Sequence, residues 1–163
     1  SHYLRNFYRD AYGIVRMHMP EEKMVVFSAS GYPSAWKHFM RGDQYKNVCM
    51  DVHLYHYRDE MAIDITTPKG LSSAIARNRR LIKEARAAGF PVIVGEWSGA
   101  AVFSNVSVTP EGRAAYERVF ISNQMASFAD AYGWFFQTWK TEKRIAAWDA
   151  RAALGTLERA MLD

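Results

Sequence analysis

The sequence predicts an α/β fold with four strand–helix units and a parallel sheet. Short apolar runs alternate along the chain with longer amphipathic segments, which is the pattern of parallel strands joined by helical crossovers. The run FPVIVGEWSG, residues 90–99, lacks polar alternation and suits a strand that is covered on both faces. The chain has 163 residues, and a complete (β/α)8 barrel needs about 250. We therefore expect a single half-barrel domain over residues 1–163.

Composition and charge narrow the class of protein. Apolar residues make up 49% of the chain and charged residues 23%, as expected for one folded domain. The net charge of +4 includes one basic cluster at residues 77–80, which we interpret as a solvated helix face. We therefore expect neither a nucleic-acid partner nor a membrane span. The single cysteine, Cys49, excludes an internal disulfide, and no signal-peptide pattern is visible, so cytoplasmic and secreted locations both stay open.

The first half of the chain is expected to contain a helix, two strands and a short helix between them. Apolar and aromatic residues at helical spacing predict the first helix over residues 3–18. The run MVVFSA, residues 24–29, predicts a buried strand. Pro33 suits the first turn of a short helix that reaches Met40. The run NVCMDVHLY, residues 47–55, predicts the second strand.

This second strand has two unlike faces, because side chains alternate along a strand. One face carries only apolar side chains, those of Val48, Met50, Val52 and Leu54. The other face carries Cys49, Asp51, His53 and Tyr55. The apolar face suits a layer of helices, and the polar face gathers the groups that a functional site would use.

The remaining elements continue the alternation. Helices are expected at residues 70–88, 109–132 and 146–162, and strands at 91–96 and 133–139. Loops are expected at residues 58–69 and 98–108. Gly89 is placed to end the first of these helices, and Thr109 with Pro110 to begin the second.

The strand at residues 91–96 ends in a carboxylate, Glu96, which is followed by Trp97. The C-terminal ends of parallel strands are where α/β sheets place their chemistry. Gly95 leaves room for a close neighbour. Glu96 is therefore a candidate catalytic group, and a strand-end glutamate paired with a nearby Arg or Lys is an equally open alternative.

Three segments together resemble glycoside hydrolase family five, in particular its exo-β-1,3-glucanase group. The segments are NVCMDVHLY for the sixth strand of that barrel, VIVGEWSGA for the seventh and GWFFQTWKTE for the eighth. The segment FYRDAYGIVR resembles the helix before the fifth strand. The resemblance implies the C-terminal half of a (β/α)8 barrel, strands five to eight.

The resemblance also implies a retaining β-glycoside hydrolase that acts on O-glycosidic bonds of β-glucan-type substrates. Glu96 matches the catalytic nucleophile, and His53 and Tyr55 match a pair that lies beside it. A tyrosine hydroxyl that donates to Glu96 would keep this carboxylate ionised. His53 would orient the nucleophile or bind a sugar hydroxyl, and a satisfied interior histidine is the open alternative.

Further candidates for substrate contact lie beside Glu96 and at the end of the eighth strand. They are Trp97, Gln137, Trp139, Lys140 and Glu142. The tryptophan rings suit stacking on sugar faces, although most strand tryptophans belong to the core. The histidines and the cysteine fit no standard zinc spacing, so neither a metal nor a cofactor is expected.

The sequence departs from the family pattern in ways that bear on activity. The family's general acid lies in an Asn-Glu-Pro context on the fourth strand, and no Asn-Glu pair occurs in this chain. Gln137 stands where the family has a tryptophan, and Ser28-Ala-Ser30 stands where an aspartate is expected. We expect the isolated chain to be inactive and to pair with a second copy or with an N-terminal half barrel. The alternative is a non-catalytic half barrel that self-associates or binds carbohydrate or a protein partner.

Overall fold

The structure is a computed structural model, and it describes residues 2–57, 62–103 and 108–155. Within them, four parallel strands form one sheet in the order β1-β2-β3-β4. The strands are β1 (Val25–Ser28), β2 (Val48–His56), β3 (Val92–Ala101) and β4 (Gly133–Phe136). The predicted parallel α/β arrangement is confirmed.

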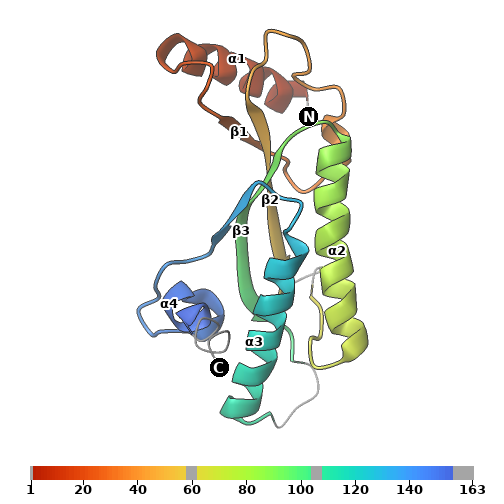
Figure 1. Cartoon of the computed structure of the whole chain (residues 1–163), viewed down its shortest axis with the longest axis vertical. Coiled ribbons are helices and arrows are strands. Elements are labelled where there is room, and N and C mark those ends of the chain that lie inside the picture. The colour runs from red at the N-terminus through yellow and green to blue at the C-terminus, as the bar shows by residue number, and fades with distance from the viewer. Residues whose placement is uncertain (1, 58–61, 104–107, 156–163) are drawn as a thin grey trace.

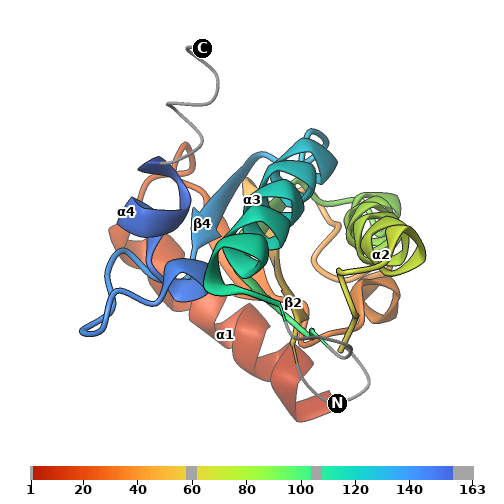
Figure 2. The ribbon, with the colours of Figure 1, turned by 90° about the horizontal axis from the view of Figure 1, so that it is seen from below.

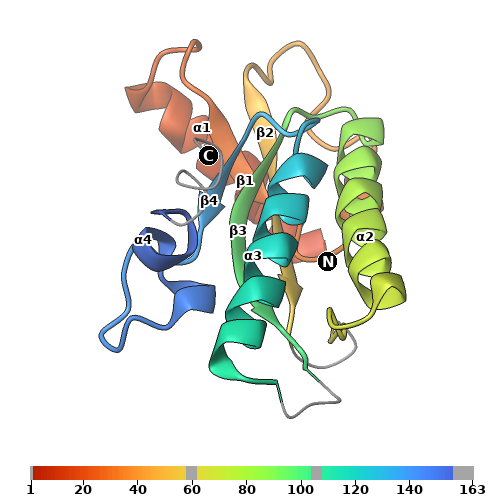
Figure 3. The same cartoon turned by 60° about the horizontal axis from the view of Figure 1, so that its bottom comes forward.

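Helical segments precede and follow the strands. They are α1 (His2–His18), η1 (Pro33–Trp36), α2 (Pro68–Ala87), α3 (Pro110–Ser127), η3 (Ala146–Trp148) and α4 (Ala150–Ala153). Helices α2 and α3 lie side by side along one face of the sheet (Figure 1). Seen from below, η3 and α4 stand beside β4, at the end where the strands finish (Figures 2 and 3).

The core lies between the sheet and helices α2 and α3. All four residues of the predicted apolar face of β2 are buried, namely Val48, Met50, Val52 and Leu54. They belong to one cluster with Ile82 and Ala85 of α2 and Ile121 of α3. Burial of each large apolar side chain contributes about 1.5–3 kcal/mol. This face of β2 therefore fixes which way its other face, the polar one, must point.

Two Thr-Pro pairs begin the long helices. The hydroxyl of Thr109 accepts a hydrogen bond from Gly112 N, as the predicted N-cap requires. The same signal occurs one helix earlier, where Thr67 accepts from Gly70 N and α2 begins at Pro68. The predicted loop at residues 58–69 is therefore too long, and its residues 58–61 lie outside the described residues.

Other predicted bounds are corrected by local backbone geometry. The short helix ends at Trp36 rather than Met40, because His38 and Met40 have positive φ angles of 66° and 44° that no right-handed helix contains. Helix α3 ends at Ser127 rather than at residue 132, where Phe128 N bonds back to Met125 O. Strand β3 continues to Ala101, where it still pairs with His56, so the loop predicted from residue 98 is wrong.

The last predicted helix, residues 146–162, is interrupted at Asp149. Its carboxylate accepts hydrogen bonds from Thr141 N at 2.8 Å and from Ala152 N at 3.3 Å, and its backbone is extended. Bonds from Arg151 and then from Thr141 N hold the pKa of Asp149 well below its usual range. Asp149 thus connects α4 to the segment that follows β4. Strand β4 ends at Phe136, not at the predicted residue 139. Residues 156–162 lie outside the described residues.

Candidate active site

Glu96 of β3 and Tyr55 of β2 meet at the C-terminal half of the sheet. The Tyr55 hydroxyl donates a hydrogen bond to Glu96 Oε2 over 2.8 Å. His53 approaches the same oxygen, with its Nδ1 at 3.5 Å. The Glu96 side chain is 40% exposed, so the carboxylate is held from one side and open to a ligand on the other. The hydrogen bond that the sequence analysis expected between Tyr55 and Glu96 is present.

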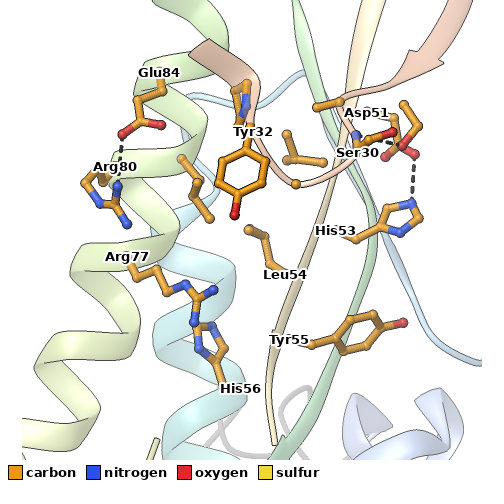
Figure 4. Close-up of a pocket in the computed structure, with 16 residues that line it drawn as sticks. Ser30, Tyr32, Asp51, His53, Leu54, Tyr55, His56, Arg77, Arg80 and Glu84 are labelled. Atoms are coloured by element: carbon orange, nitrogen blue, oxygen red, sulfur yellow. Dashed lines mark hydrogen bonds and ion pairs between the residues drawn. The ribbon is translucent and has the colours of Figure 1, made fainter. Parts of the chain in front are cut away.

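Asp51 extends this cluster by one residue. Its Oδ2 lies 2.8 Å from His53 Nε2, and its Oδ1 accepts a hydrogen bond from Gly95 N at 2.9 Å. Figure 4 shows Asp51, His53 and Tyr55 on the same side of β2, away from Leu54. A carboxylate on one ring nitrogen fixes the orientation of a histidine. Asp51 therefore directs the Nδ1 edge of His53 towards Glu96.

A β-bulge at Gly95 aims Glu96 at this cluster. Strands β2 and β3 pair Val52 with Val94 and next His53 with Glu96, so Gly95 is an extra residue on β3. Strict alternation would put Glu96 on the face of Val94, which is buried in the core. The bulge moves Glu96 to the opposite face. The N–H of Gly95, which has no strand partner there, donates to Asp51 instead.

A side chain at the bulge would displace the Asp51 carboxylate. A Cβ atom on Gly95 would lie 2.1 Å from Asp51 Oδ1. The expectation that Gly95 makes room for a close neighbour is confirmed, and the neighbour is a carboxylate of the site. One residue thus shapes the strand and admits the group that holds His53.

The same bulge corrects the prediction for Trp97. Its ring is fully buried, at 0% exposure, and packs against Phe128, Trp134 and Phe136. Because Trp97 faces the helix layer and not the Glu96 side, it cannot stack on a sugar. It belongs to the core.

The candidates after β4 are on the surface. Gln137, Lys140 and Glu142 are exposed, and Trp139 is 70% exposed. Gln137 N donates to Trp97 O over 2.8 Å, which anchors the end of β4 to β3. Among the residues that the structure describes, no hydrogen bond or ion pair joins these four side chains to Glu96. Their predicted contacts with substrate stay predictions.

Two residues of the site were absent from the predicted set. Asp51 shares the period-two face of His53 and Tyr55, so a signal for it existed. Trp148 packs on Tyr55 with ring centroids 5.8 Å apart and on Tyr57 at 5.0 Å. No sequence signal marked Trp148, because its segment reads as a regular helix. Its ring supports the tyrosine that holds Glu96.

Metal and thiol chemistry find no support at this site. Within the described parts of the chain, no group of three or more His, Cys, Asp or Glu residues could hold a metal ion. Burial raises the pKa of the Cys49 thiol to about 11, which keeps it protonated and unreactive at neutral pH. In the same described residues, no helix is long and apolar enough to cross a membrane.

Comparison with known proteins finds relatives over almost the whole chain. No protein-family model matches the chain. In an alignment 183 residues long, the chain is 28% identical to a probable glucan 1,3-beta-glucosidase A of Emericella nidulans. The alignment covers 93% of this chain and 44% of that protein. The corresponding protein of Aspergillus fumigatus is 28% identical over 185 residues, with 93% and 42% covered. The chain is thus similar, over almost its whole length, to proteins named as probable glucan 1,3-beta-glucosidases. The predicted resemblance to the exo-β-1,3-glucanase group is confirmed.

The chain spans less than half the length of these glucan 1,3-beta-glucosidase relatives, which is consistent with a C-terminal half. Rutinosidase from Aspergillus niger has the same fold over 94% of this chain and 41% of its own, with a TM-score of 0.67 and 17% identity. The predicted fold class, four βα units of a half (β/α)8 barrel, is confirmed by this likeness and by the parallel sheet.

Proposed function

We propose that this chain supplies the nucleophile half of a retaining β-glycoside hydrolase that acts on β-glucan-type substrates. The observation that carries the proposal is the Glu96 carboxylate, bonded to the Tyr55 hydroxyl and open to solvent at the C-terminal end of the sheet. The names of the homologous enzymes support the same reaction class. The substrate is a carbohydrate, and no cofactor takes part.

The proposed chemistry divides the work between two carboxyl groups. Glu96 attacks the anomeric carbon and forms a glycosyl ester, which water then hydrolyses. The hydrogen bond from Tyr55 favours the ionised carboxylate that this attack needs, and His53, held by Asp51, keeps it in place. The second carboxyl group must protonate the leaving oxygen from about 5–5.5 Å away. The chain has no Asn-Glu pair to provide it.

We propose that a complementary half barrel supplies the acid. Strands β1 and β4 are the two outer strands of the sheet. Val26 on β1 and Phe135 on β4 are 45% and 62% exposed, and exposed apolar side chains on open strand edges favour association. The partner is either an N-terminal half barrel or a second copy, in which Glu142 would serve as the acid.

A series of leaving groups tests the proposal. Hydrolysis of a dinitrophenyl β-glucoside needs no acid, whereas hydrolysis of an alkyl β-glucoside does. We expect the chain, mixed with the N-terminal half of the Emericella nidulans relative, to cleave both substrates. Mixed with the same half in which the glutamate of the Asn-Glu-Pro segment is replaced by glutamine, it should cleave the dinitrophenyl glucoside far faster than the alkyl glucoside. If a folded, assembled complex hydrolysed neither substrate, the proposed enzymatic function would be wrong.

Glu142→Gln separates the two sources of acid. In an active dimer of this chain, the substitution should abolish alkyl glucoside cleavage and leave dinitrophenyl glucoside cleavage unchanged. If both rates are unchanged, Glu142 is not the acid. Light scattering over a range of concentrations shows whether such a dimer exists.

A second candidate function is carbohydrate binding without catalysis. Gln137 favours it, because this exposed residue stands where the family has a stacking tryptophan. Buried Trp97 cannot provide the missing ring. Saturable binding of a β-glucan oligosaccharide, together with no turnover of the dinitrophenyl substrate, would support this function over the enzymatic one.

A further inference from the structure

A cavity lies on the outer side of β2, where the crossover from β1 contains only the short η1 segment. Its volume is about 770 Å³, a size typical of small-molecule sites. Residues 28–33 form one wall and α2 forms the other, with β2 between them (Figure 4). Strand β1 pairs with β2 only as far as Asp51. Glu96 is not among the lining residues, but Asp51, His53 and Tyr55 of its cluster line the inner end of the cavity.

His56 lines the outer end of this cavity with one unsatisfied nitrogen. The side chain is 1% exposed, and its Nδ1 has no hydrogen-bond partner among the described residues. Its Nε2 lies 2.9 Å from Asn78 Oδ1. An unpaired polar atom inside a protein is costly, so a hydrogen-bond donor that reached this nitrogen from the cavity would be stabilising.

A chain of hydrogen bonds determines what kind of partner this nitrogen needs. Ser127 donates its hydroxyl to Gln124 O and accepts from Asn78 Nδ2. This turns Asn78 Oδ1 towards His56, so His56 Nε2 carries the hydrogen and Nδ1 the lone pair. Burial, assisted by the charge of Arg77, lowers the pKa of His56 to about 4, so the ring is neutral at pH 7. The Nδ1 atom therefore accepts and needs a donor.

Arg77 supplies an unpaired charge next to this acceptor. It belongs to the basic cluster at residues 77–80 that the sequence suggested to be a solvated face, but its side chain lines the cavity and is directed at the ring of His56 (Figure 4). Arg80 is neutralised by Glu84 at 3.0 Å. Among the described residues Arg77 has no carboxylate partner. A guanidinium group of this kind suits bidentate binding of a carboxylate or phosphate.

We propose that this outer end of the cavity binds a small hydroxylated anion, such as a sugar acid or a sugar phosphate. Arg77 pairs with the anionic group, and His56 Nδ1 accepts a hydrogen bond from a hydroxyl of the ligand. Tyr32, on the loop after β1, closes the site from the opposite wall. The proposed site uses only the outer end of the cavity, where His56 lies on the even-numbered face of β2, and not the inner end at Asp51, His53 and Tyr55. It does not depend on the proposed function.

Calorimetric titration of the chain tests the proposal with four probes. Glucuronate and glucose 6-phosphate carry both the anion and the hydroxyls, glucose lacks the anion, and acetate lacks the hydroxyls. We expect saturable binding of glucuronate and glucose 6-phosphate. Glucose and acetate should bind at least about tenfold more weakly. Equal binding of all four probes, or no saturable binding of any, would overturn the site.

Matched variants of α2 locate the binding. Arg77→Gln should weaken glucuronate binding about tenfold or more. Arg79→Gln removes the same charge from an exposed neighbour that does not line the cavity, and should leave binding unchanged, as should Glu96→Gln. Equal losses in the Arg77 and Arg79 variants would show only non-specific charge attraction.

Nitrogen NMR of the unsubstituted protein tests the histidine without any risk of unfolding. The resonance of His56 Nδ1 should shift on saturation with glucuronate, as its lone pair accepts a hydrogen bond. A resonance that stays unmoved through a saturable titration would contradict the assignment of His56 to the site.

Discussion

The two faces of β2 carry polar side chains in opposite situations. On one face Asp51, His53 and Tyr55 are bonded to one another, to Gly95 or to Glu96, and the cluster is partly open to solvent. On the other face His56 is buried with one nitrogen unpaired. The first arrangement is preorganised, as a nucleophile requires. The second is incomplete, as expected of a site that a ligand completes.

The difference follows from what each face contacts. The inner face of β2 meets the bulge of β3, which brings a carboxylate and a free N–H to its side chains. The outer face meets α2, whose Asn78 satisfies only one nitrogen of His56. One strand thus carries a hydrogen-bonded cluster on one side and a buried, unpaired nitrogen on the other.

The largest effect is expected from removing the nucleophile. Glu96→Gln should lower kcat/KM for a β-glucoside by about three orders of magnitude or more, because an amide cannot form the glycosyl ester. Glu111→Gln, on the exposed first turn of α3, should be without effect. Steady-state kinetics of the assembled enzyme measure both, and an equal loss in the two variants would contradict the assignment.

On the outer face, the lowered pKa of buried His56 predicts that the free energy of unfolding depends on pH. Its folded pKa of about 4 lies below the ordinary value of 6.5, so between these values the unfolded chain binds more protons. Stability present above pH 6.5 should therefore fall by about 3 kcal/mol as the pH drops to 4. Urea unfolding should show this slope in the wild type and in His18→Gln, and a flatter one in His56→Phe. An unchanged slope in His56→Phe would assign the effect elsewhere.

The bulge that links the two strands is tested by Gly95→Ala. The new Cβ collides with Asp51 and displaces it, so the Gly95 N–H and His53 both lose their partner. We expect a loss of about 1–3 kcal/mol in stability and ten- to a hundredfold in kcat/KM. Gly133→Ala is the control, since nothing lies within 4 Å of a Cβ there. Similar losses at both glycines would point to strand propensity alone.

A smaller effect is expected from Tyr55→Phe. The ring keeps its contacts with Tyr57 and Trp148, and the hydrogen bond to Glu96 is lost. We predict an approximately tenfold lower kcat/KM with little change in unfolding free energy, and no change for Tyr132→Phe on the surface. A large loss of stability in Tyr55→Phe would instead make the hydroxyl a structural group.

The sequence predicted the order of elements and the strand ends that carry the site, because apolar periodicity and Thr-Pro caps are local signals. It misplaced Trp97, because the bulge at Gly95 reverses the alternation of β3 and depends on a carboxylate 44 residues away. It also missed the role of Arg77. Only the tertiary structure shows that the crossover from β1 leaves a cavity beside it.

The most direct test of the account is covalent trapping. The assembled protein is incubated with dinitrophenyl 2-deoxy-2-fluoro-β-glucoside, whose fluorine slows hydrolysis of the ester after dinitrophenolate has left. Intact-mass and peptide-mapping spectra should show one fluoroglucosyl group per chain, attached to Glu96. An unmodified chain in a folded, assembled complex, or an adduct on another residue, would contradict Glu96 as the nucleophile.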